Sequence, residues 1–120
     1  MRLRAVRGAT TVEKDTKDEI LSATAELLQE MMSRNELARE DLVSIVFTAT
    51  SDLRAVFPAE AARGIGISDV PLLCARELDV DGAMPSCIRV LMHAYTERDL
   101  QSVRHVYLGD AKKLRSDLAD

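Results

Sequence analysis

The sequence has few cysteines, and their spacing fits neither a metal site nor a disulfide framework. The two cysteines, Cys74 and Cys87, form no CxxC pair and no cluster with histidine at zinc-site spacing. A chain of 120 residues buries about two-thirds of the surface that its unfolded form exposes, so its core needs no covalent staple. We therefore expect reduced thiols in a cytoplasmic protein, with one domain over residues 1–120 and a partly flexible tail from about residue 110.

Long apolar runs and basic runs are also missing. No segment approaches the roughly 18 apolar residues of a membrane span, and arginines interrupt the first residues, where a signal peptide needs an apolar stretch. The net charge is -4, and no five basic residues follow one another. Affinity for nucleic acid comes mainly from lysine and arginine side chains that neutralise phosphates. We expect neither a nucleic acid nor a membrane among the partners.

The familiar catalytic motifs are absent as well. Neither His93 nor His105 lies in a motif with a nucleophile, and the chain contains no Walker loop and no GxSxG, HExxH or GxGxxG motif. Asp79 and Asp81 alone supply too few oxygen ligands for calcium. The sequence thus predicts no metal site and contains none of the usual nucleophilic or acid-base constellations.

The apolar pattern that is present predicts five β-strands, over residues 2–9, 42–50, 70–77, 87–96 and 104–108. β-Branched and apolar residues are concentrated in these segments, and polar or glycine-containing turns separate them. The segment 87–96 also fits a helix, because nearly every position in it is apolar. We predict a strand there, since Arg89 and His93 alternate with apolar residues.

Two helices are predicted between these strands. Thr16 and Glu19 form a capping box, in which each side chain bonds the other residue's backbone amide, and a helix follows to about Arg34. A short helix over residues 58–63 ends at Gly64. This order of elements indicates an α+β domain built on one five-stranded mixed sheet with two helices. Two helices cover only one face of such a sheet, so we expect copies of the chain to associate over the other face as a symmetric ring.

Arginine is over-represented among the basic residues, since only four of the 16 are lysine. Its planar fork of donors matches carboxylates and phosphates, although a GC-rich genome produces the same bias. Arg89 is the most informative, because it lies inside an apolar strand pattern. Its guanidinium either faces solvent or is buried against a carboxylate or a ligand, and Glu77 is a candidate partner. Tyr107 and Cys74 either line the same space or belong to the core.

Several short segments are informative as a set: RGATTVE at 7–13, TATSDL at 48–53, AVFPAEAAR at 55–63, VPLLCARELDV at 70–80, CIRV at 87–90 and RHVYL at 104–108. In this order along the chain, they resemble the monofunctional chorismate mutases of the AroH class. They extend over nearly the whole chain. The resemblance implies a homotrimer with a pseudo-α/β-barrel core and three active sites, each in the cleft between neighbouring subunits. It also supports a strand over residues 87–96.

The resemblance further implies a role for individual residues. It places Arg7 and Arg89 at the substrate's carboxylate and ether oxygen, with Arg89 nearest the oxygen of the breaking C–O bond. Glu77 and Cys74 would hold the ring hydroxyl. The other substrate-binding residues that it implies are Tyr107 at a carboxylate, Phe57 and Leu73 as apolar walls, Arg63 and Arg115 at the mouth, and Ala75 and Arg76. The chain departs from the family's pattern at the mouth, where Glu60 stands in place of a lysine of some relatives and Ser116 in place of a common proline.

The implied reaction is the Claisen rearrangement of chorismate to prephenate in phenylalanine and tyrosine biosynthesis. One C–O bond breaks as a C–C bond forms, so the enzyme needs no cofactor, acid, base or nucleophile, in keeping with the missing motifs. It has to hold a flexible dianion in its reactive shape and favour the charge separation of the transition state. One alternative is a non-enzymatic trimeric binder of small anionic metabolites, which would gain nothing from Glu77. Another is a hydrolase or deaminase that uses Cys74 or His105.

Overall fold

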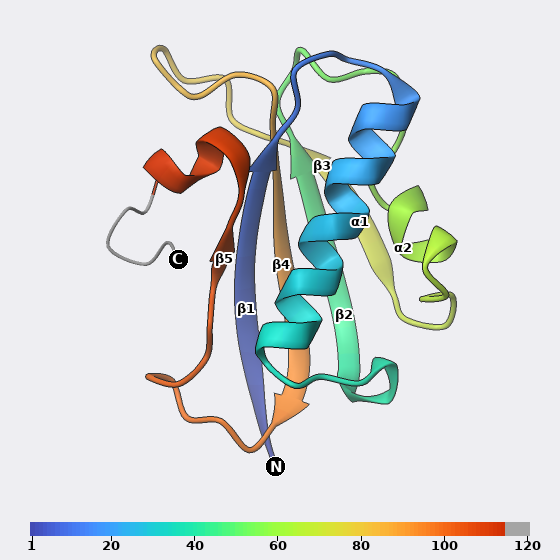
Figure 1. Ribbon diagram of the computed structural model, residues 1–120, viewed down its shortest axis with the longest axis vertical. Helices are drawn as coiled ribbons and strands as arrows, with labels where there is room; N and C mark the ends of the chain where they lie inside the picture. The colour runs from blue at the N-terminus through green and yellow to red at the C-terminus, as the bar shows by residue number, and fades with distance from the viewer. Residues whose placement is uncertain (115–120) are drawn as a thin grey trace.

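The computed structural model describes residues 1–114 of the chain (Figure 1). Its elements are β1 (Arg2–Thr11), α1 (Lys17–Arg34), the 3-10 helix η1 (Arg39–Asp41), β2 (Leu42–Ala49), α2 (Glu60–Gly64), β3 (Leu72–Arg76), β4 (Cys87–Thr96), β5 (Val106–Tyr107) and the 3-10 helix η2 (Gly109–Lys113). The five strands form one sheet in the order β3-β2-β4-β1-β5. The predicted α+β fold with five strands and two helices is therefore confirmed. In this part of the chain, no helix combines the length and the apolar character needed to cross a membrane.

The sheet is mixed because its central and edge strands pair differently. β4 is antiparallel to both of its neighbours, β1 and β2, whereas the edge strands β3 and β5 run parallel to β2 and β1. Burial along β4 alternates, because only one of its two faces packs against the α-helices. The two 3-10 helices were not predicted, and η2 occupies the start of the segment that the sequence predicted as tail, with Ala111 buried.

One face of the sheet packs against the helices and forms the main core. Val6, Phe47 and Val90 point to this side and are buried against Leu27 and Met31 of α1 together with other apolar residues. Gly8 lets α1 approach the sheet closely, since a Cβ atom at this position would lie 2.4 Å from the Met31 sulfur. Figure 1 shows α1 and α2 on the same side of the sheet.

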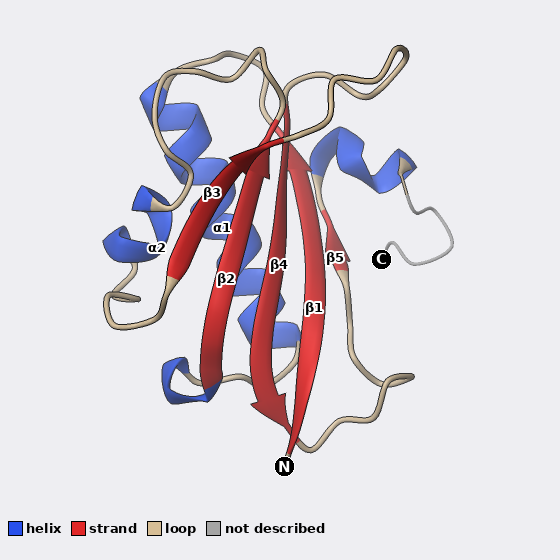
Figure 2. Ribbon diagram, turned by 180° about the vertical axis from the view of Figure 1, so that it is seen from behind, coloured by secondary structure: helices blue, strands red, loops and turns tan. Residues whose placement is uncertain are grey.

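Neither α-helix lies in front of the sheet in the view from the opposite side (Figure 2). Side chains on this face come from alternate positions of each strand and include Val46, Leu73, Leu91 and Tyr95. Leu73 and Tyr95 are among the exposed large hydrophobic residues. The two α-helices thus cover one face only, as the count of elements predicted, and we call the other side the open face. At its β5 edge, the 3-10 helix η2 packs Ala111 against Ala9 and Tyr107.

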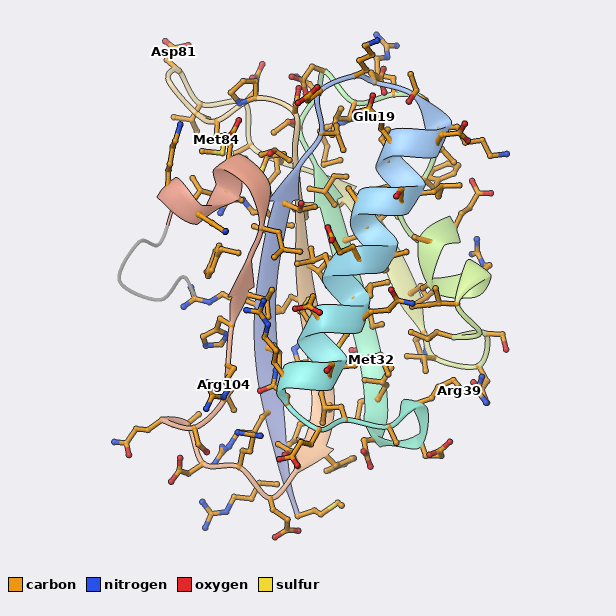
Figure 3. The ribbon with its side chains drawn as sticks, in the orientation of Figure 1. Glu19, Met32, Arg39, Asp81, Met84 and Arg104 are labelled. Atoms are coloured by element: carbon orange, nitrogen blue, oxygen red, sulfur yellow. The ribbon has the colours of Figure 1, made fainter. Side chains whose placement is uncertain are left out.

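The predicted capping box is half correct. The Thr16 hydroxyl accepts a hydrogen bond from the Glu19 backbone N–H at 3.2 Å and caps α1. The other half of the prediction is wrong: the Glu19 carboxylate, at the first turn of α1 (Figure 3), does not accept the Thr16 backbone N–H. It accepts from the N–H groups of Glu13 and Lys14, each at 3.1 Å, because the chain turns just before the cap and brings these amides closer. Glu19 therefore ties the loop between β1 and α1 to the helix.

Candidate active site

A row of residues in register crosses the open face from one edge of the sheet to the other. In strand order from β3 to β5 the row consists of Ala75, Thr48, Arg89, Ala9 and Tyr107. Residues that face each other in neighbouring strands point to the same side of a sheet. The neighbouring row on this side contains Arg7, opposite Leu91 of β4. Backbone pairing alone therefore gathers Arg7, Arg89 and Tyr107 at one place.

Glu77 reaches this place from the end of β3. Its backbone N–H donates to the carbonyl of Ala49 at 3.0 Å, which extends the pairing of β3 with β2 by one step. One carboxylate oxygen, Oε2, accepts a hydrogen bond from the Thr48 hydroxyl and lies 3.6 Å from Nε of Arg89. The Arg89 side chain is 49% exposed and that of Glu77 23% exposed. Arg89 is thus neither fully solvated nor buried, and Glu77 is the partner that the sequence suggested.

These side chains border a cavity of about 450 Å³, which we call the inner cavity. Its lining residues are Arg7, Gly8, Ala9, Val46, Thr48, Glu77, Arg89, Val90, Leu91, Tyr107 and Leu114. The volume lies in the usual range for small-molecule sites. Two guanidinium groups face a single carboxylate here, so the cavity carries excess positive charge and suits an anion with a hydroxyl group for Glu77.

Other predicted site residues border a different cavity of about 690 Å³, which we call the outer cavity. Phe57, Cys74, Ala75 and Arg76 line it, together with residues from the start of α1 and the loop after β2. Cys74 is in register with Phe47, whose side chain belongs to the core beneath the helices. Cys74 therefore points away from the open face, and one chain by itself does not bring the thiol to Glu77.

Arg63 and Leu73 line neither of the two cavities. Arg63 is exposed on α2, and Leu73 is 62% exposed on the open face of the edge strand β3. Arg115 lies outside the described residues. Arg76 has a structural role, since its Nη1 donates to the carbonyls of Thr50 at 2.7 Å and Leu53 at 3.0 Å.

A second network holds the start of β4, which carries Arg89. Ser86 has a positive φ of 53°, a conformation that a residue with a side chain rarely adopts. Oδ2 of Asp52 accepts the Ser86 N–H at 2.9 Å, and its Oδ1 accepts the Thr50 hydroxyl at 2.6 Å. The hydrogen bond from Thr50 holds the pKa of Asp52 below its usual range. The Thr50 hydroxyl also accepts the N–H of Cys87 at 3.0 Å, so Asp52 and Thr50 together fix the strand's first residues.

Thr48 and Asp52 are contributors to the site that the analysis of the sequence missed. Thr48 had a usable signal, because the period of two along β2 places it on the side opposite Phe47. Asp52 was part of the segment 48–53 that carries the resemblance, with no role of its own. Its contact with Ser86 joins residues 34 positions apart, and no local pattern reveals such a contact.

The titratable side chains near the site do not form a nucleophile with a base. Cys87 is buried, and its burial raises the pKa of the thiol, which keeps the thiol neutral. Nδ1 of His105 accepts the backbone N–H of Arg7 at 2.9 Å, so this nitrogen links the segment before β5 to β1. In residues 1–114, no three His, Cys, Asp or Glu side chains gather as metal ligands could.

Residues 3–118 of the chain match the sequence family of the type I chorismate mutases. The chain belongs to this family. This chorismate mutase is 46% identical over 120 residues to chorismate mutase AroH of Bacillus subtilis, covering 99% of the chain and 94% of that protein. It is 50% identical over 117 residues to chorismate mutase AroH of Thermus thermophilus, covering 97% and 96%. A solved structure of the chorismate mutase from Clostridium thermocellum superimposes with a TM-score of 0.91 at 49% identity, covering 92% of this chain and 98% of that one.

The resemblance to the AroH class that the sequence indicated is therefore confirmed, and with it the function. The protein is a chorismate mutase, an isomerase. Arg7, Glu77, Arg89 and Tyr107, all predicted from the sequence, share the inner cavity of this enzyme. Three other predicted site residues, Arg63 of α2 and Leu73 and Cys74 of β3, do not line this cavity on the same chain.

Proposed function

We propose that this chorismate mutase binds chorismate in the inner cavity and rearranges it to prephenate there. The observation that carries the proposal is the pair of Arg89 and Glu77, 3.6 Å apart in a cavity with an excess of guanidinium groups. A substrate with two carboxylates and a ring hydroxyl matches this set of charges. Arg7 and Tyr107 would bind carboxylate, and Glu77 would accept the hydroxyl proton in a hydrogen bond.

Arg89 has the catalytic role in this proposal. Negative charge grows on the ether oxygen as the C–O bond breaks, so a fixed donor at this oxygen binds the transition state more strongly than the substrate. The cavity wall holds the flexible dianion in the compact shape in which the two ends of the new C–C bond meet. Neither step needs a proton transfer. This suits a site near which the Cys87 thiol stays neutral and Nδ1 of His105 accepts a backbone N–H.

The second half of each site would come from a neighbouring copy in a homotrimer with a barrel-like core. Phe57 is 70% exposed and Leu73 is 62% exposed, which is costly in a free monomer. Cys74 faces away from Glu77 on its own chain, so a contact of both groups with one substrate calls for two chains. We propose that the residues of the outer cavity, with Arg63, Leu73 and Arg115, complete the inner cavity of the next subunit. The enzyme would serve phenylalanine and tyrosine biosynthesis in the cytoplasm.

The activity is tested by the loss of the diene absorbance of chorismate after addition of purified protein without metal or cofactor. We expect rapid conversion, with prephenate identified as the product. A folded protein that binds chorismate without converting it would overturn the proposal and would support the non-enzymatic anion binder instead.

The shared cleft is tested by complementation between two inactive variants. Arg89→Ala removes the inner half of the site, and Phe57→Asp places a negative charge in the outer half, where it repels a dianion. If each site combines halves from two chains, mixed trimers from co-expression contain some intact sites, and activity returns. If each chain holds a complete site, the mixture stays as inactive as the separate variants. Sedimentation of the wild type checks the trimer itself.

A further inference from the structure

We propose that Thr48 is a positioning residue that keeps the Glu77 carboxylate from closing on Arg89. The inference rests on the proposed roles of Glu77 and Arg89 at the substrate. It starts from the hydrogen bond that the Thr48 hydroxyl donates to Oε2 of Glu77. Thr48 lies on β2, between the strand that leads to Glu77 and the strand that carries Arg89.

The position of the Glu77 side chain is not set by the sheet. Glu77 lies just beyond the last residue of β3, and only its backbone N–H, bonded to Ala49, continues the pairing. The carboxylate is therefore free to rotate unless a side chain holds it. Thr48 supplies that contact from a strand whose register with Arg89 is fixed.

The distance between Glu77 and Arg89 shows why this contact matters. A carboxylate and a guanidinium in direct contact form charge-assisted hydrogen bonds of about 2.7–2.9 Å, often two in parallel. Oε2 of Glu77 stays 3.6 Å from Nε of Arg89, outside hydrogen-bonding range. The oxygen nearest to Arg89 is the one that the Thr48 hydroxyl holds.

Two consequences follow for the reaction. The N–H groups of Arg89 remain available for the ether oxygen, because Glu77 does not occupy them. Oε1 of Glu77 accepts no hydrogen bond within residues 1–114, so it is available for the ring hydroxyl of the substrate. Without the Thr48 hydroxyl, we expect Glu77 to turn onto Arg89 and form the direct ion pair, which competes with the transition state for the same donors.

The test is Thr48→Val, which keeps the size and branching of the side chain and removes the donor. We expect kcat to fall about tenfold or more, a loss typical of one hydrogen bond to a charged group, with KM changed less than about threefold. Thr48→Ser restores the hydroxyl and should bring kcat back to within about threefold of the wild type. Thr24→Val is the matched control, since Thr24 is buried in α1 and, among residues 1–114, its hydroxyl donates only to the Ile20 carbonyl at 2.6 Å. It should leave kcat unchanged even if it lowers the melting temperature.

Glu77→Gln separates the failure of this inference from the failure of the proposed site. If Glu77→Gln keeps full kcat, Glu77 has no role at the substrate, and both proposals fall. If Glu77→Gln lowers kcat and Thr48→Val does not, only the role of Thr48 is overturned. An equal loss in Thr48→Ser and Thr48→Val would also overturn it. In the Glu77→Gln background, Thr48→Val should cause no further loss; if Thr48→Val fails to fold, the comparison of Thr48→Ala with Thr48→Ser decides by the same criteria.

Discussion

Glu77 and Arg89 lie 3.6 Å apart although the strands that lead to them are not neighbours in the sheet. β2 separates these strands, and Thr48 of β2 contacts the Glu77 carboxylate between them. The Thr48 hydroxyl on the interior strand β2 thus holds the Glu77 carboxylate near Arg89 but outside hydrogen-bonding range of Nε.

Replacement of Arg89 should act on the chemical step. Removal of one donor aimed at a developing charge typically costs about 3–4 kcal/mol, so we expect Arg89→Ala to lose at least about 100-fold in kcat. Arg89→Lys should also lose most of the activity, because an ammonium group does not reproduce the guanidinium fork. Steady-state kinetics with chorismate measure both effects, and circular dichroism confirms the fold. Near-normal kcat in Arg89→Ala would remove Arg89 from its proposed role.

Replacement of Arg7 should act mainly on binding. A cation that contacts a carboxylate attracts it equally in the substrate and in the transition state, so Arg7→Ala should raise KM and leave kcat little changed. Arg7→Lys should recover part of the affinity, since a point charge still attracts the carboxylate. The same assay measures both constants. A large fall in kcat at unchanged KM would instead place Arg7 at the reacting bond.

Asp52 should make the stability of the protein depend on acidic pH. Its pKa is lowered from 3.8 in the folded protein, mainly by the hydrogen bond from Thr50, so its contribution is complete above that value. As the pH falls below 3.8, the unfolded chain takes up the proton first, and the contribution disappears as the pH passes through the folded pKa. Asp52→Asn should lower stability by at most about 1 kcal/mol at neutral pH, because the amide has one acceptor oxygen for the two donors, the Ser86 N–H and the Thr50 hydroxyl, that the carboxylate accepts.

The measurement is thermal unfolding of the wild type and Asp52→Asn at several pH values. The difference between their melting temperatures should shrink in strong acid, where Asp52 is protonated in both states. A difference that stays constant down to the lowest pH at which the protein folds would contradict the proposed role of the carboxylate.

The two thiols should differ in reactivity. Cys87 is buried, and its burial raises its thiol pKa from 9.0, whereas Cys74 is partly exposed. A disulfide reagent at about pH 8 should leave Cys87 unmodified in the native protein and should modify both cysteines after unfolding. The raised pKa of Cys87 also affects stability. The contribution of its neutral thiol to the fold is complete below pH 9.0, the ordinary pKa of a cysteine, and is lost as the pH rises through the higher pKa of the folded protein. Fast modification of Cys87 in the native protein would contradict this prediction.

The close approach of α1 to the sheet gives a matched pair of glycine variants. Gly8→Ala places a Cβ atom 2.4 Å from the Met31 sulfur and 3.1 Å from Cδ1 of Leu27, so it should destabilise the fold by about 1–3 kcal/mol as Met31 is displaced. Gly64→Ala meets nothing within 4 Å and should be neutral or slightly stabilising. Chemical denaturation compares the two variants. Equal effects would show that the contact between Gly8 and Met31 is easily relieved.

The elements of this fold could be predicted because their signals are local. Alternation, a capping threonine and terminal glycines identified the strands and helices, including β4, where the apolar pattern also fitted a helix. Non-local contacts set the details that differed. Glu19 bonds amides of the preceding loop, and the last strand is only two residues long. Its predicted first part instead bonds β1 through the His105 ring.

The site could be predicted only in part, because its residues are assembled by pairing between distant strands. The sequence alone singled out Arg89, because it lies inside an apolar strand pattern, and the structure places the suggested Glu77 carboxylate beside it. The residues alone left Tyr107 and Cys74 open between the site and the core, and the resemblance to a family gave these two residues and Arg7 their roles. It did not reveal that Cys74 faces the opposite side of the sheet from Glu77, since that depends on the register of β3 with β2.

The position of Arg89 and Thr48 on interior strands of the sheet also determines how the site responds to heat. β4 and β2 are hydrogen-bonded to a neighbour on each side, so their amide protons should exchange with solvent only when the whole sheet opens. Heating should therefore leave the inner half of the catalytic machinery intact until the domain unfolds, and activity and tertiary structure should disappear in a single cooperative step.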